Sequence, residues 1–156
     1  MISFTTKLIL ILITAFFWVA SMPPFDLGEC GFVLFVPLLI WLKAKPSYKS
    51  VIWVGGGSGL LSWIGILVFL RHVTYFGTFL LAFFLSLYFV IWLCYTRWLL
   101  PEVSRQNFAL RLLGYLSIAG LWVCIEWLRT HLFYGMPFGP LSLSQWQSPV
   151  LLQLAA

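Results

Sequence analysis

Long apolar runs are the feature that most constrains how this chain can fold. Stretches approaching 20 apolar residues, the length that crosses a bilayer as a helix, cover residues 4–22, 27–42, 51–70, 75–95 and 110–128. The second run is short for a full span. Charged residues make up only 8% of the chain, against about 25% in soluble domains. We therefore predict an all-α polytopic membrane helix bundle, with about five transmembrane helices in a single domain over residues 1–156.

The basic residues are divided unevenly between the two ends of these helices. Two of them, Arg71 and Arg129, fall on one side. The other side carries the remaining seven, which are Lys7, Lys43, Lys45, Lys49, Arg97, Arg105 and Arg111. Because short loops rich in Lys and Arg stay in the cytoplasm, we predict a cytoplasmic N-terminus. An odd number of spans then places residues 129–156 outside, as an interfacial loop.

The net charge of +5 does not indicate a nucleic-acid partner. A nucleic-acid binder gathers its basic residues into a patch or stripe, whereas here they fall between apolar runs. We therefore predict that the chain binds no nucleic acid.

Small residues recur along one side of the third and fifth predicted helices. Such spacing lets two helices approach closely in a membrane. The run VGGGSG in the third helix lacks the Gly-Lys-Ser/Thr ending of a phosphate loop, so packing is the better interpretation. We predict close helix contacts at Gly55, Ser58, Gly59 and Ser62 in the third helix, and at Gly114, Ser117 and Gly120 in the fifth.

Two opposite charges lie near the end of the fifth predicted helix. Trp122, Glu126 and Arg129 are spaced at i, i+4 and i+7, so they share one side of a helix. One interpretation is an ion pair that ends the helix, with Arg129 extended toward phosphate head groups. The other is a charge pair at the mouth of the bundle that orients a lipid head group or holds a neighbouring domain. The sequence leaves both open.

The segment after Arg129 is rich in residues that break helices. Gly135, Pro137, Gly139 and Pro140 exclude a regular helix there. Irregular backbone at a membrane is tolerated where it is buried in protein or faces water. This loop is therefore a candidate for lining a cavity on the outer side.

No residue pattern predicts a metal site, a cofactor or a catalytic group. His72 and His131 have no carboxylate or thiolate partner at ligand spacing. The three cysteines, Cys30, Cys94 and Cys124, also lack such spacing, and we interpret them as small apolar side chains. No Ser-His-Asp or Cys-His arrangement can be assembled.

Two groups of motifs resemble a known family. They are PPFDLGECGFVLFVPLLIWL at residues 23–42, and EWLRTHLFYGMPF at residues 126–138 followed by SQ at residues 144–145. Together they resemble the N-terminal membrane domain of bacterial apolipoprotein N-acyltransferase. Such enzymes move an acyl chain from a membrane phospholipid to the amino group of the lipidated N-terminal Cys of a lipoprotein. The family's reaction passes through a thioester on a catalytic Cys, with Glu and Lys partners, in an outer nitrilase-like domain.

The resemblance implies a multi-pass protein of the bacterial inner membrane whose partners are phospholipid and, when joined to a catalytic domain, lipoprotein. No position here matches the family's catalytic Glu, Lys or Cys. We therefore expect an N-terminal part that provides membrane anchoring and lipid access but is inactive alone. Candidate residues for lipid binding or domain contact are Glu126, Arg129, Gly135, Pro137, Phe138 and Gln145.

Two alternatives to this interpretation stay open at the level of sequence. One is a small polytopic subunit for binding or transport, although a transport path needs more intramembrane polar groups than this chain offers. The other is a truncated remnant with no function.

Overall fold

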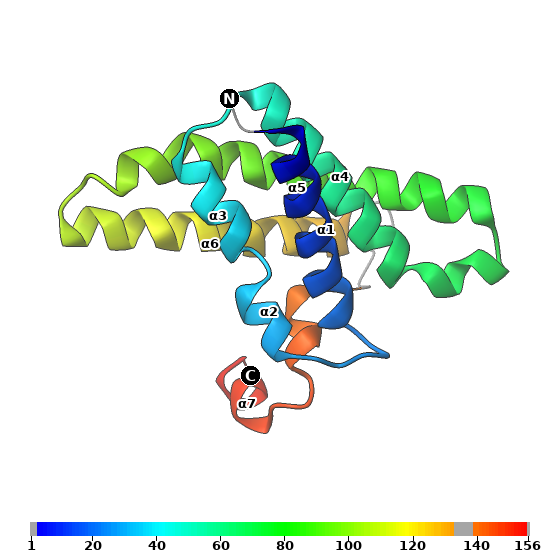
Figure 1. The fold of residues 1–156 in the computed structure, drawn as a ribbon. Helices are drawn as coiled ribbons and strands as arrows, with labels where there is room; N and C mark the ends of the chain where they lie inside the picture. The colour runs from blue at the N-terminus through cyan, green and yellow to red at the C-terminus, as the bar shows by residue number, and fades with distance from the viewer. Residues whose placement is uncertain (1–2, 133–138, 156) are drawn as a thin grey trace.

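The protein is a bundle of helices, as the sequence predicts. The computed structural model describes residues 3–132 and 139–155, and this part of the chain is all-helical, without strands. Figure 1 shows the order of the elements along the chain. They are α1 (Phe4–Ala20), α2 (Glu29–Val33), α3 (Val36–Lys43), α4 (Tyr48–Ile66), the 3₁₀ helix η1 (Val68–His72), α5 (Tyr75–Val103), α6 (Phe108–His131), the 3₁₀ helix η2 (Leu141–Gln145) and α7 (Pro149–Ala155).

The four longest helices each begin at a polar side chain that caps them. Ser3, Ser47, Thr74 and Asn107 precede α1, α4, α5 and α6, and each accepts a hydrogen bond from a backbone N–H in the first turn. Such caps satisfy amide groups that have no partner within the helix. They explain why α4 and α6 begin a few residues before the apolar runs that predict them.

The second apolar run forms two short helices instead of one. The predicted helix over residues 27–42 is divided into α2 and α3. Pro37 lies in the first turn of α3, where its missing N–H costs nothing, whereas in a continuous helix it would remove a hydrogen bond and clash with the preceding turn. The run thus bends where Leu34 and Phe35 join the two pieces.

Close contacts show in which direction each long helix runs relative to its neighbours. Ile11 lies against Gly57, and Val19 lies against Gly65, so α1 and α4 run parallel. In contrast, α5 is antiparallel to α4, because its later residue Leu93 lies against the earlier Gly55 of α4. The indole of Trp92 donates a hydrogen bond to the carbonyl oxygen of Ile118 (2.9 Å) and joins α5 to α6.

The small residues predicted to bring helices together do so in most positions. A Cβ atom at Gly59 would lie 3.1 Å from the Cα atom of Ser86, and one at Gly55 would lie 2.7 Å from Leu93. A Cβ atom at Gly114 would lie 2.3 Å from Val103. The prediction is wrong for Gly120, where an added Cβ would meet no atom within 4 Å.

A cluster of aromatic rings, which we call the aromatic hub, joins all the long helices. Neighbouring ring centroids in the hub lie 4.9 to 6.2 Å apart, a spacing at which aromatic pairs attract. Its members are Trp18 of α1, Phe35 between α2 and α3, Trp63 of α4, Phe89 and Trp92 of α5, and Trp122 of α6. The hub is the centre of the core.

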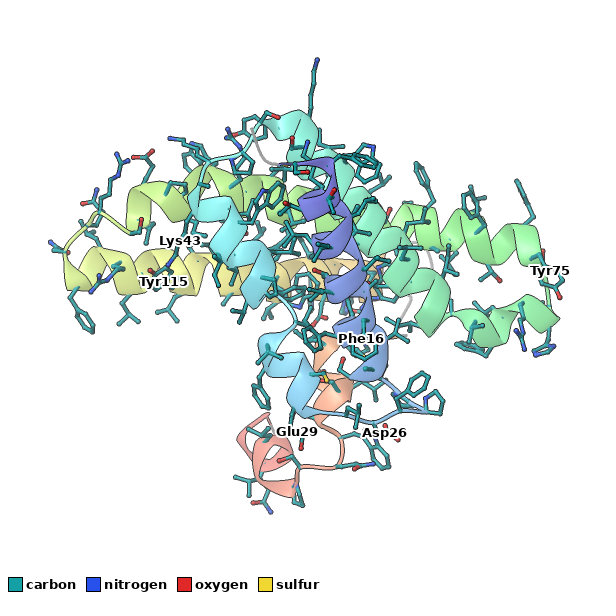
Figure 2. All side chains as sticks on the ribbon, in the orientation of Figure 1. Phe16, Asp26, Glu29, Lys43, Tyr75 and Tyr115 are labelled. Atoms are coloured by element: carbon teal, nitrogen blue, oxygen red, sulfur yellow. The ribbon has the colours of Figure 1, made fainter. Side chains whose placement is uncertain are left out.

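The outside of the bundle is also apolar. Large side chains such as Phe76 (77% exposed) and Phe108 (73% exposed) face outward, and Figure 2 shows side chains projecting from α5 and α6 along their length. Within the described residues, α5 and α6 are long and apolar enough to cross a membrane, and α1 is a shorter apolar helix. The other predicted spans stay predictions.

The close approach of α4 and α5 predicts that Gly59→Leu destabilises the bundle. The larger side chain would have to displace the backbone of α5 at Ser86, and overpacking of this kind costs about 1–3 kcal/mol. The measurement is thermal unfolding of the protein in detergent micelles. Gly120→Leu makes a similar change in a helix at an open position and should leave the midpoint close to that of the wild type. Equal midpoints for the two variants would contradict the packing.

Candidate functional site

Glu126 connects α6 to the segment that follows it. Its Oε1 atom accepts a hydrogen bond from the backbone N–H of Leu141 (2.7 Å). Leu141 is the first residue of η2, and the first amide groups of a helix have no partner inside it. The half-buried carboxylate therefore fixes the start of η2 against the side of α6.

Arg129 lies inside the bundle near the end of α6. Its side chain is only 5% exposed, and its Cζ atom lies 5.0 Å from the ring centroid of Trp63. The position favours a cation–π contact, and Glu126 attracts the guanidinium electrostatically. This placement differs from an arginine that extends outward toward head groups, which was one of the two interpretations of the sequence.

Gln145 and Trp146 join the end of η2 to the loop before α2. The Nε2 atom of Gln145 donates a hydrogen bond to the carbonyl oxygen of Gly28 (2.7 Å). The indole of Trp146 donates one to Oδ1 of Asp26 (2.8 Å). Both contacts link residues more than 100 positions apart in the chain, and Figure 1 shows η2 and α7 beside α2.

Two glycines allow this contact to be close. A Cβ atom at Gly28 would lie 2.7 Å from the carbonyl oxygen of Ser144, and one at Gly31 would lie 2.6 Å from Ser144 Oγ. A side chain at Gly28 would press on the backbone of Ser144, whereas one at Gly31 would require only the side chain of residue 144 to move or change. We call the contact between residues 26–31 and 141–146 the seam.

The structure describes three of the six candidate residues from the sequence. Glu126, Arg129 and Gln145 all lie toward the end of the bundle where α6 finishes. Gly135, Pro137 and Phe138 lie outside the described residues. Of residues 129–156, expected as a loop, 129–131 complete α6, and the described part also contains η2 and α7.

Sequence reasoning missed the partners of these candidates. Asp26, Gly28 and Trp146 belong to the seam, but no spacing in the sequence pairs residues that are so distant. The motifs carried the only available signal, since Asp26 and Gly28 are part of the quoted run at residues 23–42 and Trp146 follows the SQ pair.

A polar hollow lies beside the seam. Its volume is about 430 Å³, and its lining includes Asp26, Glu29, Gln145 and Ser148. These groups can donate or accept hydrogen bonds. No two of the described lining residues combine a nucleophile with a general base. The described residues contain no group of three or more His, Cys, Asp or Glu that could hold a metal ion. Through these polar groups the site can bind and position a molecule.

Loss of the Glu126 carboxylate should release η2 from α6. In Glu126→Ala the amide of Leu141 loses its acceptor and Arg129 loses a nearby opposite charge, while Glu126→Gln keeps an oxygen that can accept the hydrogen bond. A fully buried donor without a partner costs about 1–3 kcal/mol, and the half-buried amide of Leu141 should lose part of that. Hydrogen–deuterium exchange over residues 139–147 should therefore rise strongly in Glu126→Ala and weakly in Glu126→Gln.

The matched control for this experiment is Glu102→Ala. This change removes the ion pair between Lys45 and Glu102, whose side chains are 52% and 55% exposed, and such surface pairs contribute about 0–1 kcal/mol. Exchange over residues 139–147 should stay unchanged in it. Unchanged exchange in Glu126→Ala as well would show that the carboxylate does not hold η2.

Comparison with known proteins gives one match that covers most of the chain. Residues 14–156 match the family described as the apolipoprotein N-acyltransferase N-terminal domain. The comparisons with curated proteins and with solved structures found no match. The matched range contains Glu126, Arg129 and the whole seam, in agreement with the resemblance seen in the motifs. The chain therefore belongs to the apolipoprotein N-acyltransferase N-terminal domain family.

Proposed function

We propose that this chain is the membrane part of an apolipoprotein N-acyltransferase. In this role it anchors the enzyme and gives it access to phospholipid, the acyl donor, and to the lipidated N-terminal Cys of lipoproteins. The observation that carries the proposal is the family match over residues 14–156. The apolar outer surface of the bundle also supports the proposal, because acyl chains can stay in contact with such a surface without being exposed to water.

In the proposed orientation the chain crosses the bacterial inner membrane five times and begins in the cytoplasm. The observed helix directions support this arrangement, because they gather the loops rich in Lys and Arg at one end. At that end, Arg97 donates a hydrogen bond to the carbonyl oxygen of Pro46 and lies over the ring of Tyr48. The seam then lies at the outer end.

The seam is proposed to form part of the floor beneath the reaction centre. Glu126 and Gln145 hold η2 in place, and the polar hollow beside it can receive the head of a substrate whose acyl chains stay in the bilayer. Covalent chemistry is assigned to residues outside 1–156. Cys30, Cys94 and Cys124 are unpaired thiols, and none of them has a hydrogen bond to an acidic or basic group within the described residues.

The proposal predicts that the chain supports acyl transfer only when it is joined to an outer catalytic domain. The purified chain in phospholipid vesicles should leave a diacylated lipopeptide unchanged by mass spectrometry. A chimera in which it replaces the N-terminal domain of an active apolipoprotein N-acyltransferase should convert the lipopeptide to the triacylated form.

Two variants of the chimera connect this activity to the seam. Glu126→Ala should lower the rate about tenfold or more, because misplacement of groups that position a substrate is costly. Glu102→Ala, at the opposite end, should leave the rate unchanged. N-acylation by the chain alone would contradict the assignment of the chemistry, and an inactive chimera with an intact outer domain would contradict the role of the chain.

A further inference from the structure

A second, apolar groove lies on the side of the bundle, and its lining reaches Leu141 at the start of η2. Its volume is about 610 Å³, within the range of about 300–1,000 Å³ that ligand sites occupy. Most of its lining comes from α3, α5 and α6. Val36 and Ile40 form one wall, Ile118 and Val123 form the other, and Trp92 contributes to the floor. No element of the described chain fills it.

The two walls are matched faces of helices. On α3 the lining residues run from Val36 to Lys43, and on α6 they run from Tyr115 to Val123, at the i, i+3, i+4 and i+7 spacing of a single helix face. At 1.5 Å per residue the groove extends roughly 11–12 Å along each helix. It is therefore a channel that follows the helices, with a shape that suits an extended hydrocarbon chain.

A positive charge stands at one end of this channel. Among the described residues of the lining, only Lys43 is charged. Lys43 is exposed, and these residues give it no hydrogen bond or ion pair. Figure 2 shows Lys43 and Tyr115 together at this end, and Arg111 lies one turn before Tyr115 on the same face of α6. The nearby acid Glu102 is bound to Lys45 at 2.7 Å.

This combination favours a lipid over another helix as the occupant. Helices that associate in membranes approach through small residues, whereas these walls carry large side chains, and among the described residues of the lining only Ala119 is small. An acyl chain can follow such an uneven hollow. The cation at the open end then complements an anionic head group.

We propose that the groove between α3 and α6 binds an acyl chain of an anionic phospholipid, with the phosphate of its head group at Lys43 and Arg111. Because Lys43 lies at the end of the bundle opposite the seam, this lipid belongs to the other leaflet from the proposed reaction. It is a bound structural lipid and not the acyl donor. The inference requires the chain to lie in a membrane and does not depend on acyl transfer.

The test is native mass spectrometry of the purified full chain, incubated in detergent with phosphatidylglycerol or with phosphatidylcholine. The wild type should retain one phosphatidylglycerol in preference to phosphatidylcholine. Lys43→Ala should lower retention of phosphatidylglycerol about fivefold, the effect of one lysine near an anionic head group. Lys49→Ala, at the same end but outside the lining, should not change it.

A second pair of variants tests the apolar part of the groove. Ala119→Trp fills the channel from an exposed position of α6 and should abolish retention of the lipid. Leu116→Trp, which is outside the lining, should retain it, and circular dichroism should show that both variants keep their helices. Equal retention in Ala119→Trp and the wild type would overturn the proposal. Equal losses in Lys43→Ala and Lys49→Ala, or a stable dimer that excludes lipid, would do the same.

Discussion

The hydrogen bond from the amide of Leu141 to Glu126 decides where the last part of the described chain lies. A carboxylate near the end of an apolar helix needs a donor, and the first amide of η2 needs an acceptor. Each satisfies the other, so η2 is placed against α6. Gln145 and Trp146 can then reach Gly28 and Asp26, and the seam closes.

The aromatic hub explains why this end of the molecule can hold charges at all. Trp18, Trp63 and Trp122 surround the region that Arg129 enters, and the ring of Trp63 faces its guanidinium. The same hub connects α1, α4, α5 and α6, so its packing fixes the helix ends that meet at the seam. Packing and polar contacts therefore act together. The aromatic rings set the distances between the helices, and these distances allow the hydrogen bonds at the helix ends to form.

Much of the helical content could be predicted from the apolar runs, since all five runs contain helices and the glycines at 55 and 59 pack as expected. The break between α2 and α3 follows from Pro37, which a reading by hydropathy alone does not weigh. The seam could not be predicted, because it joins residues over 100 positions apart and periodicity reports only on neighbours along one helix. The same limit hid the buried position of Arg129.

Disulfide trapping in native membranes can show whether residues 26–31 and 141–146 lie together. A Cβ atom at Gly31 would lie 3.4 Å from the Cβ atom of Ser144, close to the separation that a disulfide needs. With Cys30, Cys94 and Cys124 replaced by Ala, the pair Gly31→Cys and Ser144→Cys should cross-link under mild oxidation. The pair Gly31→Cys and Lys49→Cys, at opposite ends of the bundle, should not. Absence of the first cross-link, or equal yields for the two pairs, would show that the two segments do not meet.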